Sequence, residues 1–127
     1  MPDTHDASPA GAAGSHLVRV QDMPWEPTDF PGIRMKVLYS DPPTGRSTIM
    51  FKLEPGAVVP PHEHTALEQT YVLEGSLEDH EGAARTGEFV WRPGGSVHTA
   101  VAPRGAVILC FFSKPNRFFA GTPFYVS

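Results

Sequence analysis

The stretch GAVVPPHEHTALEQTYVLEG, residues 56–75, carries the strongest indication of the fold. It holds two histidines and three glutamates, with two prolines directly ahead of the first histidine. Each proline disfavours helix at the residue before it, so residues 57–64 are expected to be extended. Side chains alternate between the two faces of a strand, which places His62 and His64 on one face and Glu63 on the other. Two imidazoles are therefore expected to point in the same direction from one strand.

Extended segments separated by turn residues lie on both sides of this stretch. Upstream, residues 33–40 and 46–54 are rich in β-branched and aromatic residues and flank the turn DPPTG. Downstream, the expected strands cover residues 68–75, 88–93, 96–102 and 106–113, with a short hairpin region over 76–87. About eight short strands at spacings of roughly 8–12 residues predict an all-β sandwich or barrel. The chain has 14 Pro and 12 Gly, and no segment shows helical periodicity.

The histidines are candidate metal ligands. Two neutral imidazoles together with the carboxylate of Glu68 suit Fe(II), Mn(II), Ni(II) or Zn(II). His98, thirty-four residues after His64, would supply a third imidazole from a strand entered through a Pro-Gly-Gly turn. The zinc motif HExxH is excluded because residue 66 is alanine. Two histidines beside a loop, taken alone, are more often surface residues, so the metal interpretation depends on both segments together.

The two segments resemble the two conserved motifs of the cupin superfamily. The first motif is met, with every spacing, by Gly56, His62, His64, Glu68 and Gly75. The second is met by Gly87, Pro93, Gly95 and His98, with Ala102 where asparagine is usual. The resemblance implies a double-stranded β-helix, or jelly-roll barrel, with one divalent transition metal in its mouth, and Fe(II) is favoured. A single cupin domain is expected over residues 17–127, with its core at 32–113, after an N-terminal tail at 1–16.

A narrower resemblance covers residues 32–113. This region is similar to the branch that contains the cupin domain of ChrR-type anti-sigma factors, acetylacetone dioxygenase and 2,4′-dihydroxyacetophenone dioxygenase. Three histidines are the dependable ligands in that branch. Glu68 is therefore expected to be a fourth ligand, a catalytic base, or the acceptor of a hydrogen bond that fixes the tautomer of a ligating imidazole. The resemblance implies a small Fe(II)-dependent dioxygenase that cleaves a C–C bond of a β-diketone or hydroxyketone-type small molecule.

Two other functions stay open. The first is a non-catalytic cupin that senses a metal or a ligand. The chain shows no zinc-binding anti-sigma segment, which weakens this alternative. The second is a redox-neutral, metal-dependent isomerase, lyase or decarboxylase.

Composition limits the partners. The net charge of −4 and the pI near 5.8 provide no basic field for nucleic acid or anionic lipid. No apolar run approaches the roughly 18 residues of a membrane helix. Cys110, the single cysteine, excludes an internal disulfide, fits a cytoplasmic protein and is expected to be a small core residue. The aromatic C-terminal segment is expected on the outside of the barrel or at the interface of a homodimer.

Several side chains have expected environments. On the strand at 47–54, either Met50 and Lys52 or Phe51 and Leu53 face inward. Arg92 is expected to be solvated. The core or an interface is expected for Tyr71, Phe89, Trp91, Phe111 and Phe112. Solvent exposure, away from the metal, is expected for His5, His16 and His80.

Overall fold

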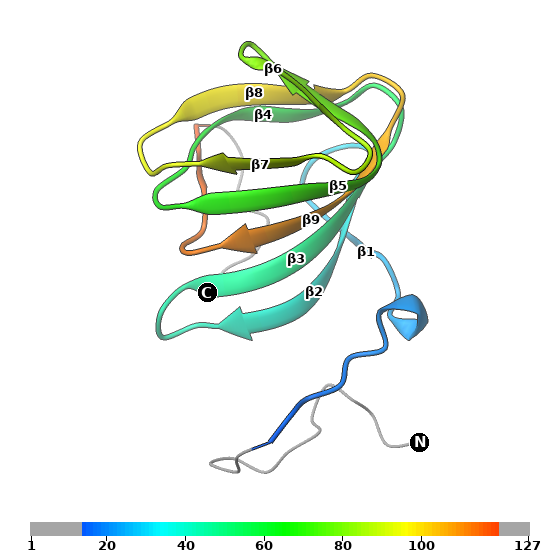
Figure 1. Cartoon of the computed structure of the whole chain (residues 1–127), viewed down its shortest axis with the longest axis vertical. Helices are drawn as coiled ribbons and strands as arrows, with labels where there is room; N and C mark the ends of the chain where they lie inside the picture. The colour runs from blue at the N-terminus through cyan, green and yellow to red at the C-terminus, as the bar shows by residue number, and fades with distance from the viewer. Residues whose placement is uncertain (1–13, 120–127) are drawn as a thin grey trace.

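The described chain is built almost entirely of β-strands. A computed structural model describes residues 14–119. In this range the helical structure is one 3₁₀ turn, Val20–Asp22. The strands (Figure 1) are β1 Glu26–Pro27, β2 Ile33–Asp41, β3 Arg46–Leu53, β4 Ala57–Glu63, β5 Glu68–Asp79, β6 Gly82–Arg85, β7 Phe89–Arg92, β8 Val97–Ala102, β9 Ala106–Phe112 and β10 Arg117–Phe118. The predicted all-β class is confirmed.

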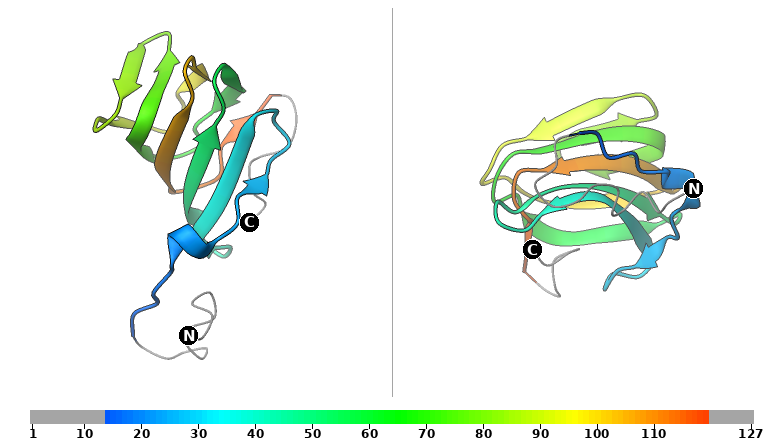
Figure 2. Two further views of the ribbon diagram at one scale, coloured as in Figure 1. Left: turned by 90° about the vertical axis from the view of Figure 1, so that its right-hand side faces the viewer. Right: turned by 90° about the horizontal axis from the view of Figure 1, so that it is seen from below.

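Antiparallel pairing joins these strands into one curled sheet. The order is β1-β2-β3-β9-β5-β8-β4-β10, and β6 and β7 also pair with β5. Figure 2 shows the sheet folding back on itself, so that β4 and β8 face β3 and β9 across the interior. This is the single-domain jelly roll that the cupin resemblance implies. The tail predicted over residues 1–16 falls mostly outside the described residues, and the domain boundaries stay a prediction.

The strand boundaries differ from expectation in two places. β5 continues four residues past Gly75 and ends at Asp79. The short strand β10 pairs with β4, which places Phe118 opposite His62. Both differences bring unpredicted side chains to the end of the barrel where His62 and His98 lie. Among the described residues, no helix is long and apolar enough to cross a membrane.

Alternation along β3 and β9 fills the interior. Phe51 and Leu53 of β3 are buried, whereas Lys52 is exposed. Of the two predicted alternatives, the inward-facing pair is therefore Phe51 and Leu53. Cys110 is buried between Ile108 and Phe112 on β9, as predicted. The apolar core therefore lies between the two sides of the curled sheet, as in a sandwich.

The outer face of β7, β5 and β9 carries aromatic side chains in solvent. Tyr71 lies opposite Phe89 in the pairing register, and Gln69 lies opposite both Trp91 and Phe111. These four aromatic side chains are all exposed, with Trp91 at 61 %. A core or an interface was predicted for them. The structure excludes the core, because their parity along each strand is that of the outer face, and an interface stays a prediction. Of the five aromatic residues considered, Phe112 is the buried one.

Candidate metal centre

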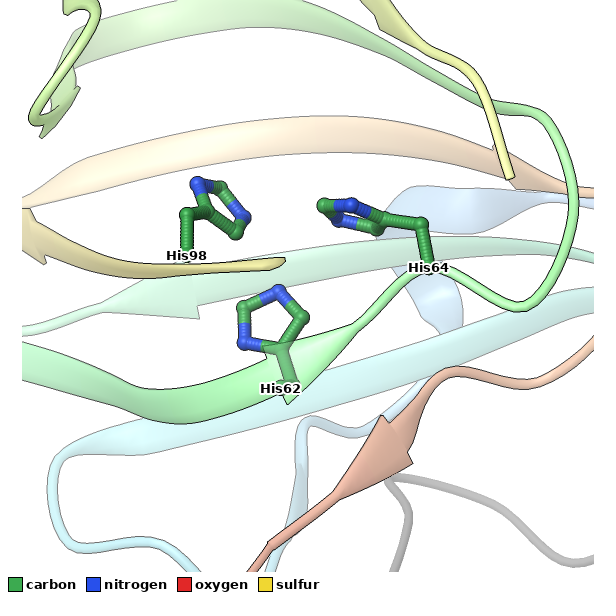
Figure 3. A group of neighbouring side chains, drawn as sticks. All are labelled: His62, His64 and His98. Carbon is green, nitrogen blue, oxygen red and sulfur yellow. The ribbon is translucent and has the colours of Figure 1, made fainter. Parts of the chain in front are cut away.

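The barrel brings the three predicted histidines together. His62 lies on β4 opposite His98 on β8, and His64 follows the end of β4. The backbone N–H of His64 donates to the carbonyl oxygen of Ser96 at 2.9 Å, which holds the loop before β8 beside it. One ring nitrogen from each histidine lies within 4.8 Å of the other two. Figure 3 shows the three rings turned toward one common point. Glu63 faces the surface, as expected, and pairs with Arg117 at 2.8 Å.

Each imidazole has its Nδ1 atom engaged by the protein. Nδ1 of His62 donates to the carbonyl oxygen of Pro60 at 2.7 Å, and Nδ1 of His98 lies 2.7 Å from a carboxylate oxygen of Asp79. Nδ1 of His64 is 2.8 Å from Oγ of Ser96. That hydroxyl itself donates to the carbonyl of Pro93, so it accepts from His64. A neutral ring with its proton on Nδ1 has its lone pair on Nε2. The three Nε2 atoms are thus free to act as ligands.

Burial keeps these rings in the form that binds metal. All three histidines are less than 8 % exposed. Burial, together with the nearby His98 and His64, lowers the pKa of His62 to about 4. Burial also lowers the pKa of His98, although its hydrogen bond to Asp79 acts in the opposite direction. Both rings are neutral at neutral pH, as metal binding requires.

Glu68 lies at the start of β5, beside His64. Its Oε1 is 2.7 Å from Nε2 of His64, yet that nitrogen makes no well-directed hydrogen bond. Oε2 accepts a hydrogen bond from Thr70 at 3.1 Å. Burial alone would raise the pKa of Glu68, but contact with His64 and the charge of Arg92 outweigh it and lower the pKa to about 2. The close, poorly directed approach fits two adjacent ligands of one ion, which lie roughly 3 Å apart when each bond is about 2.1 Å.

A buried ion pair that the sequence did not reveal supports His98. Oδ2 of Asp79 accepts from both Nδ1 of His98 and Nη2 of Arg92, at 2.7 and 2.9 Å. The side chains of Asp79 and Arg92 are 3 % and 11 % exposed. The prediction that Arg92 is solvated was therefore wrong. Arg92 lies opposite Glu68 in the pairing of β5 with β7, and both side chains point inward. The sequence held one signal for Asp79. Leu77 is an apolar residue that faces inward, and alternation along β5 turns the side chain two residues later to the same face.

The C-terminal segment crosses the same end of the barrel. Thr65 donates to the carbonyl of Pro115 at 2.7 Å, and β10 then pairs with β4. The Phe118 ring lies 5.0 Å from the ring of His62 and 4.8 Å from that of Phe30. The aromatic segment was predicted to lie on the outside of the barrel or at a dimer interface. This prediction was wrong for Phe118, which packs beside His62. Phe119, the next aromatic residue of the segment, is 53 % exposed, which agrees with an outer location. Phe124 and Tyr125 lie outside the described residues.

The space beside the histidines is small. A cavity of about 30 Å³ is lined by His62, His98, Glu68 and other inward-facing side chains. A water needs at least about 10–15 Å³ of such space, so this cavity holds one or two waters. A wider surface cleft of about 460 Å³ lies along β6 and β7, and Arg92 lines both spaces. As predicted, His16 and His80 are exposed, whereas His5 lies outside the described residues.

Comparison with known proteins agrees with this architecture. A jelly roll that brings three histidines together at one end of its barrel defines the chain as a cupin. More narrowly, the chain belongs to the ChrR cupin-like domain family, whose profile matches residues 13–116. This confirms the resemblance drawn from the sequence motifs.

The relatives include both regulators and enzymes. The chain is 33 % identical over 104 residues to the anti-sigma-E factor ChrR of Cereibacter sphaeroides, covering 79 % of this chain and 46 % of that protein. It therefore spans less than half of that relative. The structure of Rhodobacter sphaeroides SigE in complex with the anti-sigma ChrR matches with a TM-score of 0.64 at 27 % identity, over 75 % of this chain and 51 % of the other.

An acetylacetone dioxygenase from Acinetobacter johnsonii has a structure that matches with a TM-score of 0.76. The match covers 92 % of this chain and 91 % of that chain, at 18 % identity. At this identity the similarity concerns the fold.

Proposed function

We propose that this chain is a metal-dependent cupin whose metal ligands are His62, His64 and His98. The observation that carries the proposal is the convergence of three buried imidazoles, each with Nδ1 engaged and Nε2 available. Imidazole nitrogen suits several divalent transition metals, and Fe(II) is the first candidate. Glu68 is either a fourth ligand or a base beside the metal, and its short distance to His64 supports both roles.

The reaction that we propose is oxidative C–C cleavage of a β-diketone or hydroxyketone. Similarity in fold to an acetylacetone dioxygenase supports this choice. A divalent ion held by the histidines would act as a Lewis acid that favours the enolate and orients the reactants. Glu68, ionised at neutral pH, could accept the acidic proton of the substrate if it is not a ligand. Because the cavity of about 30 Å³ holds only one or two waters, the substrate must displace them and widen the pocket.

Oxygen consumption tests the enzymatic proposal. Protein loaded anaerobically with Fe(II) is mixed with β-diketones and hydroxyketones, and uptake is followed with an oxygen electrode. We expect substrate-dependent uptake that disappears in His98→Ala together with the bound metal. His80→Ala, which removes an exposed histidine, is the matched control and should behave as wild type. Retention of one equivalent of metal in both His98→Ala and His62→Ala would refute the ligand assignment.

The second candidate is a sensing role without catalysis. The 33 % identity to the anti-sigma-E factor ChrR favours it. One equivalent of bound metal, with no oxygen uptake across the panel, would support this role. The expected companion result is metal-dependent binding to a sigma factor, measured by calorimetry. Conversion of a substrate under strict anaerobiosis would instead indicate a redox-neutral isomerase, lyase or decarboxylase.

We also propose that the protein is a homodimer. The exposed side chains of Tyr71, Phe89, Trp91 and Phe111 form an uncharged aromatic face on β7, β5 and β9. The same face on a second copy can pack against it, with Gln69 between Trp91 and Phe111, and clustered exposed apolar side chains often mark interfaces. Light scattering should give the dimer mass for wild type and the monomer mass for Trp91→Glu. A monomeric wild type would refute the proposal.

A further inference from the structure

Asn116 lies in the wall of the histidine cavity, although it comes from the C-terminal segment. Its position is fixed on both sides, by the hydrogen bond from Thr65 to the carbonyl of Pro115 and by the pairing of β10 with β4. The residue is 8 % exposed and lines the same cavity as His62 and His98. An uncharged amide is thus held beside the centre by structure that does not depend on its side chain.

The chemistry of Glu68 fixes the orientation of this amide, with its nitrogen toward the carboxylate. Nδ2 of Asn116 donates to Oε1 of Glu68 at 3.3 Å. The opposite orientation would place a carbonyl oxygen against a carboxylate oxygen, two acceptors with no hydrogen between them. The amide oxygen Oδ1 is therefore left over, and it is buried without a hydrogen-bond partner. A buried acceptor without a partner in the protein is rare, and either a water or a ligand atom in the cavity can donate to it.

A complementary donor lines the same cavity. Nε of Arg92 is also buried without a hydrogen-bond partner, while Nη2 of the same side chain is held by Asp79. Asn116 and Arg92 both line the cavity, and they carry one unpaired acceptor and one unpaired donor. A ligand that satisfies both needs an O–H group and an oxygen lone pair. A hydroxyketone has both, whereas an O-methylated analogue lacks the donor.

We propose that Asn116 binds the ligand of the histidine centre by accepting a hydrogen bond from its hydroxyl group, so that the centre selects small hydroxyketones. This inference rests on the proposed metal centre and narrows its substrate class.

Binding of a matched pair of probes to Ni(II)-loaded protein tests the inference without turnover. The probes are hydroxyacetone and methoxyacetone, and calorimetry measures their dissociation constants for wild type, Asn116→Leu and Asn116→Ala. The dissociation constant for hydroxyacetone should be about five to ten times higher in both variants. This change is roughly what the loss of one hydrogen bond causes. Methoxyacetone should change by less than about twofold, because it cannot donate to Oδ1.

Ser47→Ala is the matched control. Its Oγ is another buried oxygen without a partner, but it does not line the histidine cavity. This variant should bind both probes as wild type does. Equal changes for the two probes in the Asn116 variants, or no change for either, would overturn the inference while leaving the metal centre intact. Failure of wild type to bind hydroxyacetone would also overturn it. Absence of bound Ni(II) in wild type would refute the metal centre itself, and the inference with it.

Discussion

Replacing Asp79 by asparagine should lower both the stability of the barrel and its affinity for metal. The carboxylate is almost fully buried and accepts hydrogen bonds from Arg92, from His98 and, through Oδ1, from the backbone N–H of Glu81. Asp79→Asn preserves the shape but removes the charge opposite a guanidinium that is 11 % exposed. Breaking a buried pair on one side costs about 3–5 kcal/mol. Loss of the carboxylate behind a ligating histidine weakens metal affinity by about 10–100-fold.

Two measurements resolve these effects. Chemical denaturation of metal-free protein should show the loss in the free energy of unfolding, and competition with a chelator should show the loss in metal affinity. In the double variant Asp79→Asn, Arg92→Met, stability should partly return, because the unpaired charge is gone, while metal affinity stays low. Glu78→Gln removes the adjacent carboxylate on the same strand and serves as the control. Wild-type values for both quantities in Asp79→Asn would show that the ion pair neither stabilises the barrel nor supports His98.

Three further predictions concern the metal, acid and the backbone. Saturating metal at about a hundred times its dissociation constant should raise the free energy of unfolding by about 2.7 kcal/mol, and EDTA should abolish the gain; no shift would contradict a site specific to the folded state. The metal-free protein should lose about 3 kcal/mol as pH falls from 6.5 to 4, because the pKa of His62 is about 6.5 in the unfolded chain and about 4 in the folded protein. Urea midpoints across this range measure the loss, and a flat profile would be the contrary result. Gly75→Ala should destabilise far more than Gly56→Ala in thermal melts. Both residues have positive φ, at 76° and 83°, but a Cβ atom would collide with the carbonyl of Gly105 only at Gly75. Equal losses in the two variants would show that the collision relaxes.

The fold was predictable because its signals are local. Proline, glycine and β-branched residues mark strands and turns in the sequence itself, and the predicted boundaries at β3, β4 and β9 agree with the structure to within about one residue. Gly75 was taken for a strand end, but the backbone there adopts a positive φ and the strand continues to Asp79. Glycine within a strand and glycine at its end look alike in a sequence, because both supply the same backbone freedom.

The site was predictable only in part. His62, His64 and His98 have fixed spacings in two motifs, so their convergence could be expected. Asp79 and Asn116 come from segments whose approach depends on the closure of the whole barrel. Such approaches are set by long-range pairing, as between β10 and β4, and a single sequence carries no periodic signal for them.

The burial of Cys110 has a practical consequence. It is the single cysteine of the chain, 2 % exposed, and its Sγ lies 3.5 Å from Oγ1 of Thr70, which in turn donates to Glu68. Burial, reinforced by the charge of Glu68, raises the pKa of this thiol, so it is unreactive in the closed barrel. A thiol reagent can therefore label Cys110 under native conditions only when the barrel opens. The rate of thiol labelling, followed by a colour reaction, therefore measures how often the barrel opens. Any ligand that binds only the folded protein should lower this rate as its occupancy rises.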